Sequence, residues 1–89
     1  MHGPADLDIF LLIEVADASL QYDRKRKLAE YARYGIAEVW IVNLRANQLE
    51  VFRCPLGLGY EERMIVAGDS VVSPAAFPDI RVPLAAILR

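Results

Sequence analysis

The sequence contains one cysteine and one histidine, and their scarcity excludes several kinds of chemistry. Cys54 has no second cysteine for an internal disulfide or a cysteine zinc site, so we expect a reduced thiol in the cytoplasm. His2 lies at the start of the chain, so histidine-based catalysis is not expected. The sequence also lacks a P-loop, a GxGxxG motif and an HExxH motif, which argues against common nucleotide-binding and zinc-protease sites.

Long apolar runs and an excess of positive charge are missing as well. The run at residues 9–13 is too short to span a bilayer, and Asp6 and Asp8 stand where a signal peptide would be basic. We therefore expect no membrane association. A net charge of −2 argues against a generally basic nucleic-acid-binding surface, although residues 24–27 form a local basic patch.

Apolar residues are abundant for so short a chain. The length of 89 residues predicts one domain covering residues 1–89, and 55% of the residues are hydrophobic. Large exposed apolar patches usually mark interfaces. We therefore expect part of this surface to face a second copy, as in a homodimer, or a missing segment.

Periodicity and turn residues predict the order β-α-β-β-β followed by a short C-terminal helix. The main helix should run from about residue 20 to 34, bury a stripe of Leu28, Tyr31 and Ala32, and end at Gly35 in a Schellman motif. A β-α-β unit has parallel strands and the later hairpins add antiparallel ones, so we expect an α/β (α+β) mixed sheet with this helix on one face. The expected strands are 8–15, 38–43, 48–53 and 60–66, with connections at 44–47 and 54–59, an extended piece at 70–72, and a helix at 84–88 with Pro83 in its first turn.

Glu14 is the most informative residue, because it places a charge at the end of a solidly apolar strand. Burying an unpaired charge is costly, so Glu14 needs a partner such as a lysine or a metal ion. Ligands of open α/β sheets bind at the carboxyl ends of parallel strands, where Glu14 is expected. The alternative is a partly exposed glutamate that pairs with a helix lysine and has a structural role only.

Lys27 is the expected partner, since it lies beside Leu28 at the edge of the buried stripe and could lean toward Glu14. There it would polarise a phosphate or hold an attacking water while Glu14 binds Mg²⁺. Asp23, four residues before Lys27, makes a pair that by itself only stabilises the helix. Asp8 shares a strand face with Glu14, but the two lie about 20 Å apart on an extended strand, so a shared ion requires a bend near Asp8. Otherwise Asp8 is a solvated residue at the start of the strand.

The stretch at residues 13–42 reads IEV, a turn, YDR and K on a helix, YA, and then GI-x-E-x-W-I-V. This pattern resembles the Uma2 family of restriction-endonuclease-like proteins in the PD-(D/E)XK superfamily, and the likeness continues through residues 49–53 and 59–60. The resemblance implies a nuclease-type mixed sheet, Mg²⁺ or Mn²⁺, and hydrolysis of DNA phosphodiester bonds. Glu14 looks like the acidic member of the motif. Ala16 stands where the motif lysine would be, so Lys27 is the matching lysine, and Asp23 belongs to the same helical motif.

The resemblance also implies an N-terminal half, with an upstream metal-binding aspartate, that this sequence lacks. Asp8 matches an acidic position near the IEV strand, so Glu14 and Asp8 are the candidate metal ligands. Three functions remain open. The first is a metal-dependent DNA endonuclease, or an inactive remnant of one because the upstream acid is absent. The second is a non-catalytic homo-oligomeric interaction module, and the third is a DNA-binding domain that uses residues 24–27.

Overall fold

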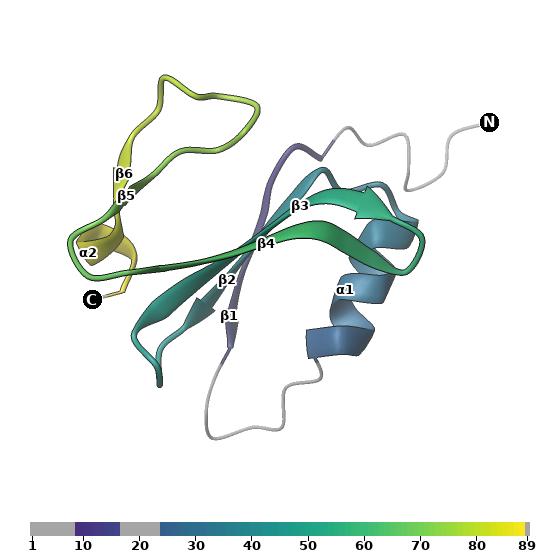
Figure 1. Cartoon of the computed structure of the whole chain (residues 1–89), viewed down its shortest axis with the longest axis horizontal. Coiled ribbons are helices and arrows are strands. Elements are labelled where there is room, and N and C mark those ends of the chain that lie inside the picture. Colours follow the sequence, from purple (N-terminus) through teal and green to yellow (C-terminus); the bar gives the residue numbers. More distant parts are fainter. Residues whose placement is uncertain (1–8, 17–23, 89) are drawn as a thin grey trace.

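A computed structural model describes residues 9–16 and 24–88 of the chain. Its elements follow the predicted order, and the predicted mixed α+β class is confirmed (Figure 1). The elements are β1 (Leu12–Ala16), α1 (Arg24–Arg33), β2 (Glu38–Asn43), β3 (Gln48–Leu56), β4 (Gly59–Ala67), β5 (Val71–Val72), β6 (Val82–Pro83) and α2 (Leu84–Ile87).

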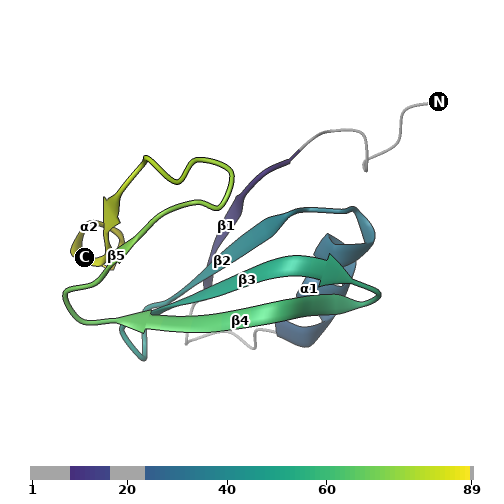
Figure 2. The same ribbon diagram turned by 45° about the horizontal axis from the view of Figure 1, so that its top comes forward.

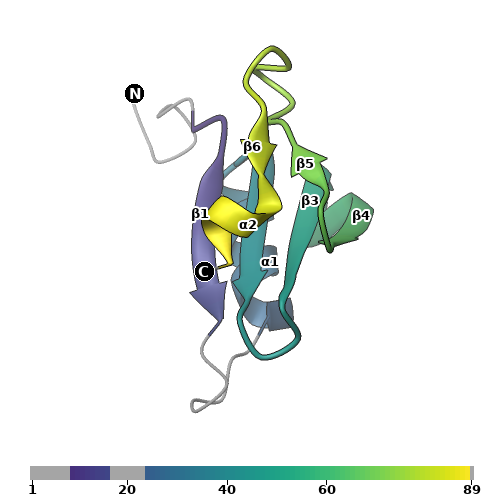
Figure 3. The ribbon, with the colours of Figure 1, turned by 90° about the vertical axis from the view of Figure 1, so that its left-hand side faces the viewer.

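The main sheet has the strand order β1-β2-β3-β4, and the four strands lie side by side in Figure 2. β1 runs parallel to β2, whereas β2–β3 and β3–β4 are antiparallel. The predicted parallel pairing across the helix is therefore confirmed. β5 and β6 form a separate two-stranded sheet that the sequence did not predict. Figure 3 shows this small sheet and α2 on one side of the main sheet and α1 on the other.

The sheet carries a hydrophobic core on each face, which explains why β2 is apolar throughout. Residues 38–42 of β2 are all buried. The residues of β3 divide between the two faces, since Phe52 packs under α1 whereas Leu49 and Val51 pack on the opposite face. The α1-side core contains Ala16, Leu28, Ile36, Val39, Ile41 and Phe52, and the opposite core contains Trp40, Val42, Leu49, Val51, Val72 and Leu84.

The C-terminus of α1 has the predicted Schellman geometry. Gly35 has φ +72°, a left-handed conformation that glycine adopts without the steric cost of a side chain. The Ile36 amide donates to the Tyr31 carbonyl over 3.1 Å, and the Gly35 amide donates to the Ala32 carbonyl over 3.0 Å. These two bonds satisfy carbonyls that the end of the helix would otherwise leave unpaired. They also direct the chain immediately into β2.

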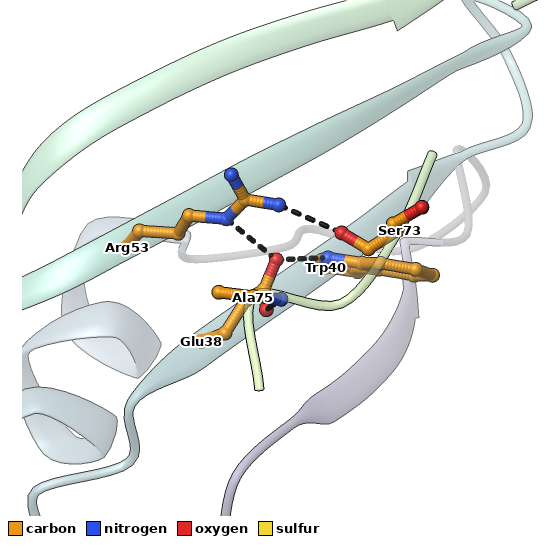
Figure 4. A network of polar contacts seen from close by, with 5 residues as sticks. All are labelled: Glu38, Trp40, Arg53, Ser73 and Ala75. Carbon is orange, nitrogen blue, oxygen red and sulfur yellow. Dashed lines mark hydrogen bonds and ion pairs between the residues drawn. The ribbon is translucent and has the colours of Figure 1, made fainter. Parts of the chain in front are cut away.

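A buried carboxylate attaches the C-terminal segment to the main sheet (Figure 4). Glu38 is 1% exposed, and its Oε2 accepts hydrogen bonds from Trp40 Nε1 over 2.7 Å and from Arg53 Nε over 2.8 Å. Its Oε1 accepts from the Ala75 amide over 2.7 Å, while Arg53 Nη2 donates to the Ser73 carbonyl over 2.8 Å. Both oxygens of this buried charge are therefore satisfied, and the segment that follows β5 is fixed against β2 and β3.

Three predicted boundaries were wrong. The expected connection at 54–59 is mostly strand, because Leu56 pairs with Gly59 and only residues 57–58 form the turn. Gly57 has φ +60°, as expected for glycine at the first central position of a type II′ hairpin turn. β1 begins at Leu12, so residues 9–11 precede the strand. Pro83 belongs to β6 and precedes α2 as its N-cap, with φ −65°, instead of lying inside the first turn.

β1 is an edge strand with one uncovered face. Ile13 and Val15 are 54% and 55% exposed, although they alternate with residues that face α1. Phe10, just before the strand, is also exposed. The apolar excess in the composition therefore lies partly on the surface along this edge.

Candidate active site

Glu14 faces α1 from the middle of β1, so the prediction that it lies at the end of the strand was wrong. The strand extends to Ala16, because Ala16 pairs with Asn43 of β2. Leu12 and Ala16, two residues to either side, belong to the core beneath α1, and alternate strand residues share a face. Glu14 is thus a carboxylate placed within an otherwise apolar row. Only 19% of its side chain is exposed, so it needs polar partners from the protein.

Two side chains of α1 supply those partners. Lys27 Nζ lies 2.8 Å from Glu14 Oε1, and the Tyr31 hydroxyl donates to Glu14 Oε2 over 2.5 Å. Residues four apart project from the same face of a helix, so α1 brings both donors to one carboxylate. The structure therefore joins Glu14 and Lys27 as the sequence predicted. Both sequence-based alternatives, a structural ion pair and a catalytic pair, require this contact.

Tyr31 is part of the site, although the sequence indicated only that it lies on the buried stripe. Burial raises the pKa of its hydroxyl, and the adjacent Glu14 carboxylate raises it further. The hydroxyl therefore remains protonated at neutral pH and keeps donating to Glu14. Tyr31 thus fixes one oxygen of the carboxylate, and Lys27 meets the other.

A second acid–base pair lies two strands away. Glu14 is in register with Ile41 on β2, and Ile41 is in register with Glu50 on β3. Arg24 Nη2 of α1 lies 2.8 Å from Glu50 Oε2, and Asn43 Nδ2 lies 3.5 Å from the same oxygen. One face of α1 therefore places a cation on each of two carboxylates that flank Ile41.

Glu50 is not among the candidate site residues that the sequence predicts. The signal in the sequence is that Glu50 and Phe52 lie two residues apart on a strand. They therefore share one face, and the apolar Phe52 indicates that this face is turned toward the core. Glu50 is only 3% exposed. A charged residue at a core-facing position is rare unless it is paired or functional, so its position alone identified a candidate.

Two predicted residues, Asp8 and Asp23, lie outside the described residues. Within residues 9–16 and 24–88, no group of three or more histidine, cysteine, aspartate or glutamate side chains is placed to hold a metal ion. Glu14 and Glu50 nevertheless have the hard oxygen donors that suit Mg²⁺. This ion is usually bound by one or two carboxylates together with water and substrate phosphates, so the donor chemistry fits.

Comparison with protein families gives a match over most of the chain. In the described ranges no helix is long and apolar enough to cross a membrane. No curated protein matches the chain. The family model Uma2, described as "Putative restriction endonuclease", matches residues 2–85 and therefore nearly the whole sequence. The chain with this Glu14–Lys27 pair and mixed sheet belongs to the Uma2 family of restriction-endonuclease-like proteins.

Proposed function

We propose that this protein is a Mg²⁺- or Mn²⁺-dependent DNA endonuclease that hydrolyses phosphodiester bonds. The observation that carries the proposal is the 2.8 Å contact between Glu14 and Lys27, which lies on the inner face of the sheet in a chain of a nuclease-like family. Acidic and basic side chains held together beside one parallel strand are suited to binding a cation and a phosphate at adjacent positions.

In the reaction that we propose, a water oxygen forms a bond to phosphorus as the bond from phosphorus to the leaving sugar oxygen breaks. The water gives up a proton to solvent, and the leaving oxygen takes one from solvent. A divalent ion, when bound, neutralises phosphate charge and makes the water more acidic. Glu14 would bind the ion, aided by Asp8, and Tyr31 would hold the carboxylate in place. Lys27 would donate to the attacking water or to a non-bridging phosphate oxygen.

DNA is the proposed partner because cations gather at the start of α1. Arg24, Lys25, Arg26 and Lys27 are consecutive, and Lys25 and Arg26 are exposed. Basic side chains on one short segment attract phosphates, and their contribution weakens at higher salt, because the counterions that binding displaces from DNA gain less entropy. This segment would position the backbone of DNA near Glu14, and Asp23 directly precedes it in the sequence. The single cysteine is in keeping with a cytoplasmic location.

The test is a plasmid-nicking assay in Mg²⁺ and in Mn²⁺. The wild type should nick the plasmid, and a chelator should stop the reaction. Glu14→Gln and Lys27→Met should each lower the rate by at least a hundredfold, about 2.7 kcal/mol of transition-state stabilisation. Glu30→Gln is the matched control, because Glu30 is an exposed acid on the same helix. Nicking that persists in Glu14→Gln, or is absent from the wild type with both ions, would refute the proposal.

The exposed face of β1 favours a second candidate, a non-catalytic homo-oligomeric interaction module. Ile13 and Val15 form an apolar edge on which a second copy could pack. Sedimentation of the wild type should then give a dimer, and Ile13→Lys should give a folded monomer. A wild type that is monomeric at high concentration would remove this candidate. A dimer that nicks DNA would leave the nuclease proposal in place.

A further inference from the structure

The sheet contains two deeply buried glutamates that each meet an arginine, but their surroundings differ. Glu38, on the face opposite α1, has partners on both carboxylate oxygens (Figure 4). Glu50, on the α1 face, has partners on Oε2 only. Among the described residues, Glu50 Oε1 has no hydrogen-bond partner and less than 1 Å² of accessible surface. Both carboxylate oxygens of Glu38 thus accept hydrogen bonds, whereas only one oxygen of Glu50 does so among the described residues.

Arg24, the arginine beside Glu50, also has a hydrogen-bond donor without an acceptor among the described residues. Arg24 Nε is buried and has no hydrogen-bond partner in the described part of the chain, whereas Arg53 donates from both Nε and Nη2. Arginine and carboxylate groups commonly form two parallel hydrogen bonds, but Arg24 and Glu50 form one. Buried polar atoms without partners are rare in proteins, and those that occur often face a water, an ion or a functional group. The pair therefore leaves Glu50 Oε1 without a hydrogen-bond partner among the described residues.

Glu50 lies on the same face of the sheet as Glu14, in register with it across β2. The two glutamates lie in one row across β1, β2 and β3, with Ile41 between them, and both contact α1. Neighbouring strands are about 4.8 Å apart, so the two Cα atoms are separated by about 10 Å. Side chains that lean across Ile41 bring the two carboxylates closer together, so that both can reach one ion directly or through a bound water, since Mg²⁺ holds its oxygens at about 2.1 Å and retains several waters.

We propose that Glu50 is the second carboxylate of the divalent-cation site at Glu14, and that Arg24 occupies its place until the cation binds. This inference rests on the proposed function. It identifies a donor within the described residues, on a different strand from Glu14. Arg24 is 37% exposed along its side chain, so its guanidinium can swing toward solvent, and the bound ion then balances the buried charge of Glu50.

Charge balance supports this exchange. Two carboxylates at this row face two cations, Lys27 and Arg24. A bound divalent ion supplies the two positive charges that the carboxylates need. Lys27 and Arg24 then become available for the phosphate of the substrate, which carries the opposite charge. The same residues would thus pair with the carboxylates before the ion binds and contact the DNA once the ion is in place.

Calorimetric titration with Mn²⁺ tests the inference, with plasmid nicking in parallel. Glu50→Gln keeps the size of the side chain but lowers its charge, so we expect Mn²⁺ to bind about ten- to a hundredfold more weakly. Arg24→Gln removes the competing cation, so we expect tighter binding. Glu61→Gln is the matched control, because Glu61 is an exposed acid on β4 and its loss should leave the affinity unchanged. Circular dichroism checks that each variant is folded.

The outcomes separate this inference from the proposed function. If the wild type binds Mn²⁺ and nicks DNA, and Glu50→Gln binds equally well, the inference is overturned while the nuclease proposal stands. That result would mean that a water satisfies Glu50 Oε1. If the wild type neither binds Mn²⁺ nor nicks DNA, both fail. If Glu50→Gln does not fold, Arg24→Gln decides, because an unchanged affinity overturns the inference and a gain supports it.

Discussion

Replacing Glu38 by glutamine should destabilise the protein more than any other isosteric change on β2 or β3. The variant keeps the shape of the side chain, so no cavity forms, but it removes a buried negative charge and turns one acceptor into a donor. At least one of the groups that now donate to Glu38 would lose its acceptor. These groups are Trp40 Nε1, Arg53 Nε and the Ala75 amide.

The magnitude follows from burial. Glu38 is 1% exposed along its side chain and Arg53 is 25% exposed, so water can restore only part of what Arg53 loses. A hydrogen bond to a charged group contributes about 1.5–3 kcal/mol, and an orphaned buried donor costs about 1–3 kcal/mol. We therefore expect a loss of about 3–4 kcal/mol. The total stability of a domain of this size is roughly 4–13 kcal/mol, so the change is a large part of it.

Urea unfolding followed by fluorescence is a direct assay, because Trp40 is the only tryptophan and donates to Glu38 itself. Glu62→Gln, an exposed acid on β4, is the control and should change stability by no more than about 0.5 kcal/mol. The double variant with Arg53→Met should show a coupling above about 1 kcal/mol with Glu38→Gln. A loss below about 1 kcal/mol in Glu38→Gln would refute the conclusion that this network holds the C-terminal segment in place.

Three further predictions concern packing, turns and pH. Leu84→Ala, at a fully buried position, should cost about 2–5 kcal/mol in urea unfolding, and a loss under 1 kcal/mol would contradict its place in the core. Gly35→Ala should cost about 1–2 kcal/mol because of its φ of +72°, whereas Gly59→Ala should cost less. Burial raises the pKa of Tyr60 to about 12, so the folded state retains a proton that the unfolded state releases from about pH 10. Stability should therefore fall as the pH rises from 10 to 12, and less steeply in Tyr60→Phe; equal slopes would contradict this.

Local features of the fold could be predicted from the sequence because their causes are local. β2 was predicted with its observed ends, since a continuous apolar run between a glycine turn and a polar loop has few alternatives. The Schellman ending was predicted because Gly35 and Ile36 occupy positions that the motif requires. The contact of Lys27 with Glu14 followed from helix periodicity and from the needs of a buried carboxylate.

Features that depend on distant pairing could not be predicted in the same way. Pro55 and Gly57 are typical of a loop, and the sequence therefore predicts one here. Pro55 nevertheless pairs with Tyr60, because the pairing of β3 with β4 continues as far as Leu56 and Gly59. The contact between Arg24 and Glu50 joins residues 26 positions apart, and no local pattern in the sequence indicates that these two side chains pair. The small sheet of β5 and β6 has two residues per strand, which is too short for a periodic signal.

The topology of the main sheet also implies an order of assembly. β2, β3 and β4 are successive antiparallel neighbours joined by short turns, so their contacts close small loops and form at little entropic cost. The β1–β2 pairing closes a longer loop that contains α1, so we expect it to form after the hairpins. Glu14 therefore reaches Lys27 late in folding, and hydrogen exchange should find the β1 amides less protected than those of β3. The proposed site would then be gained and lost with the docking of one strand, while the rest of the sheet stays folded.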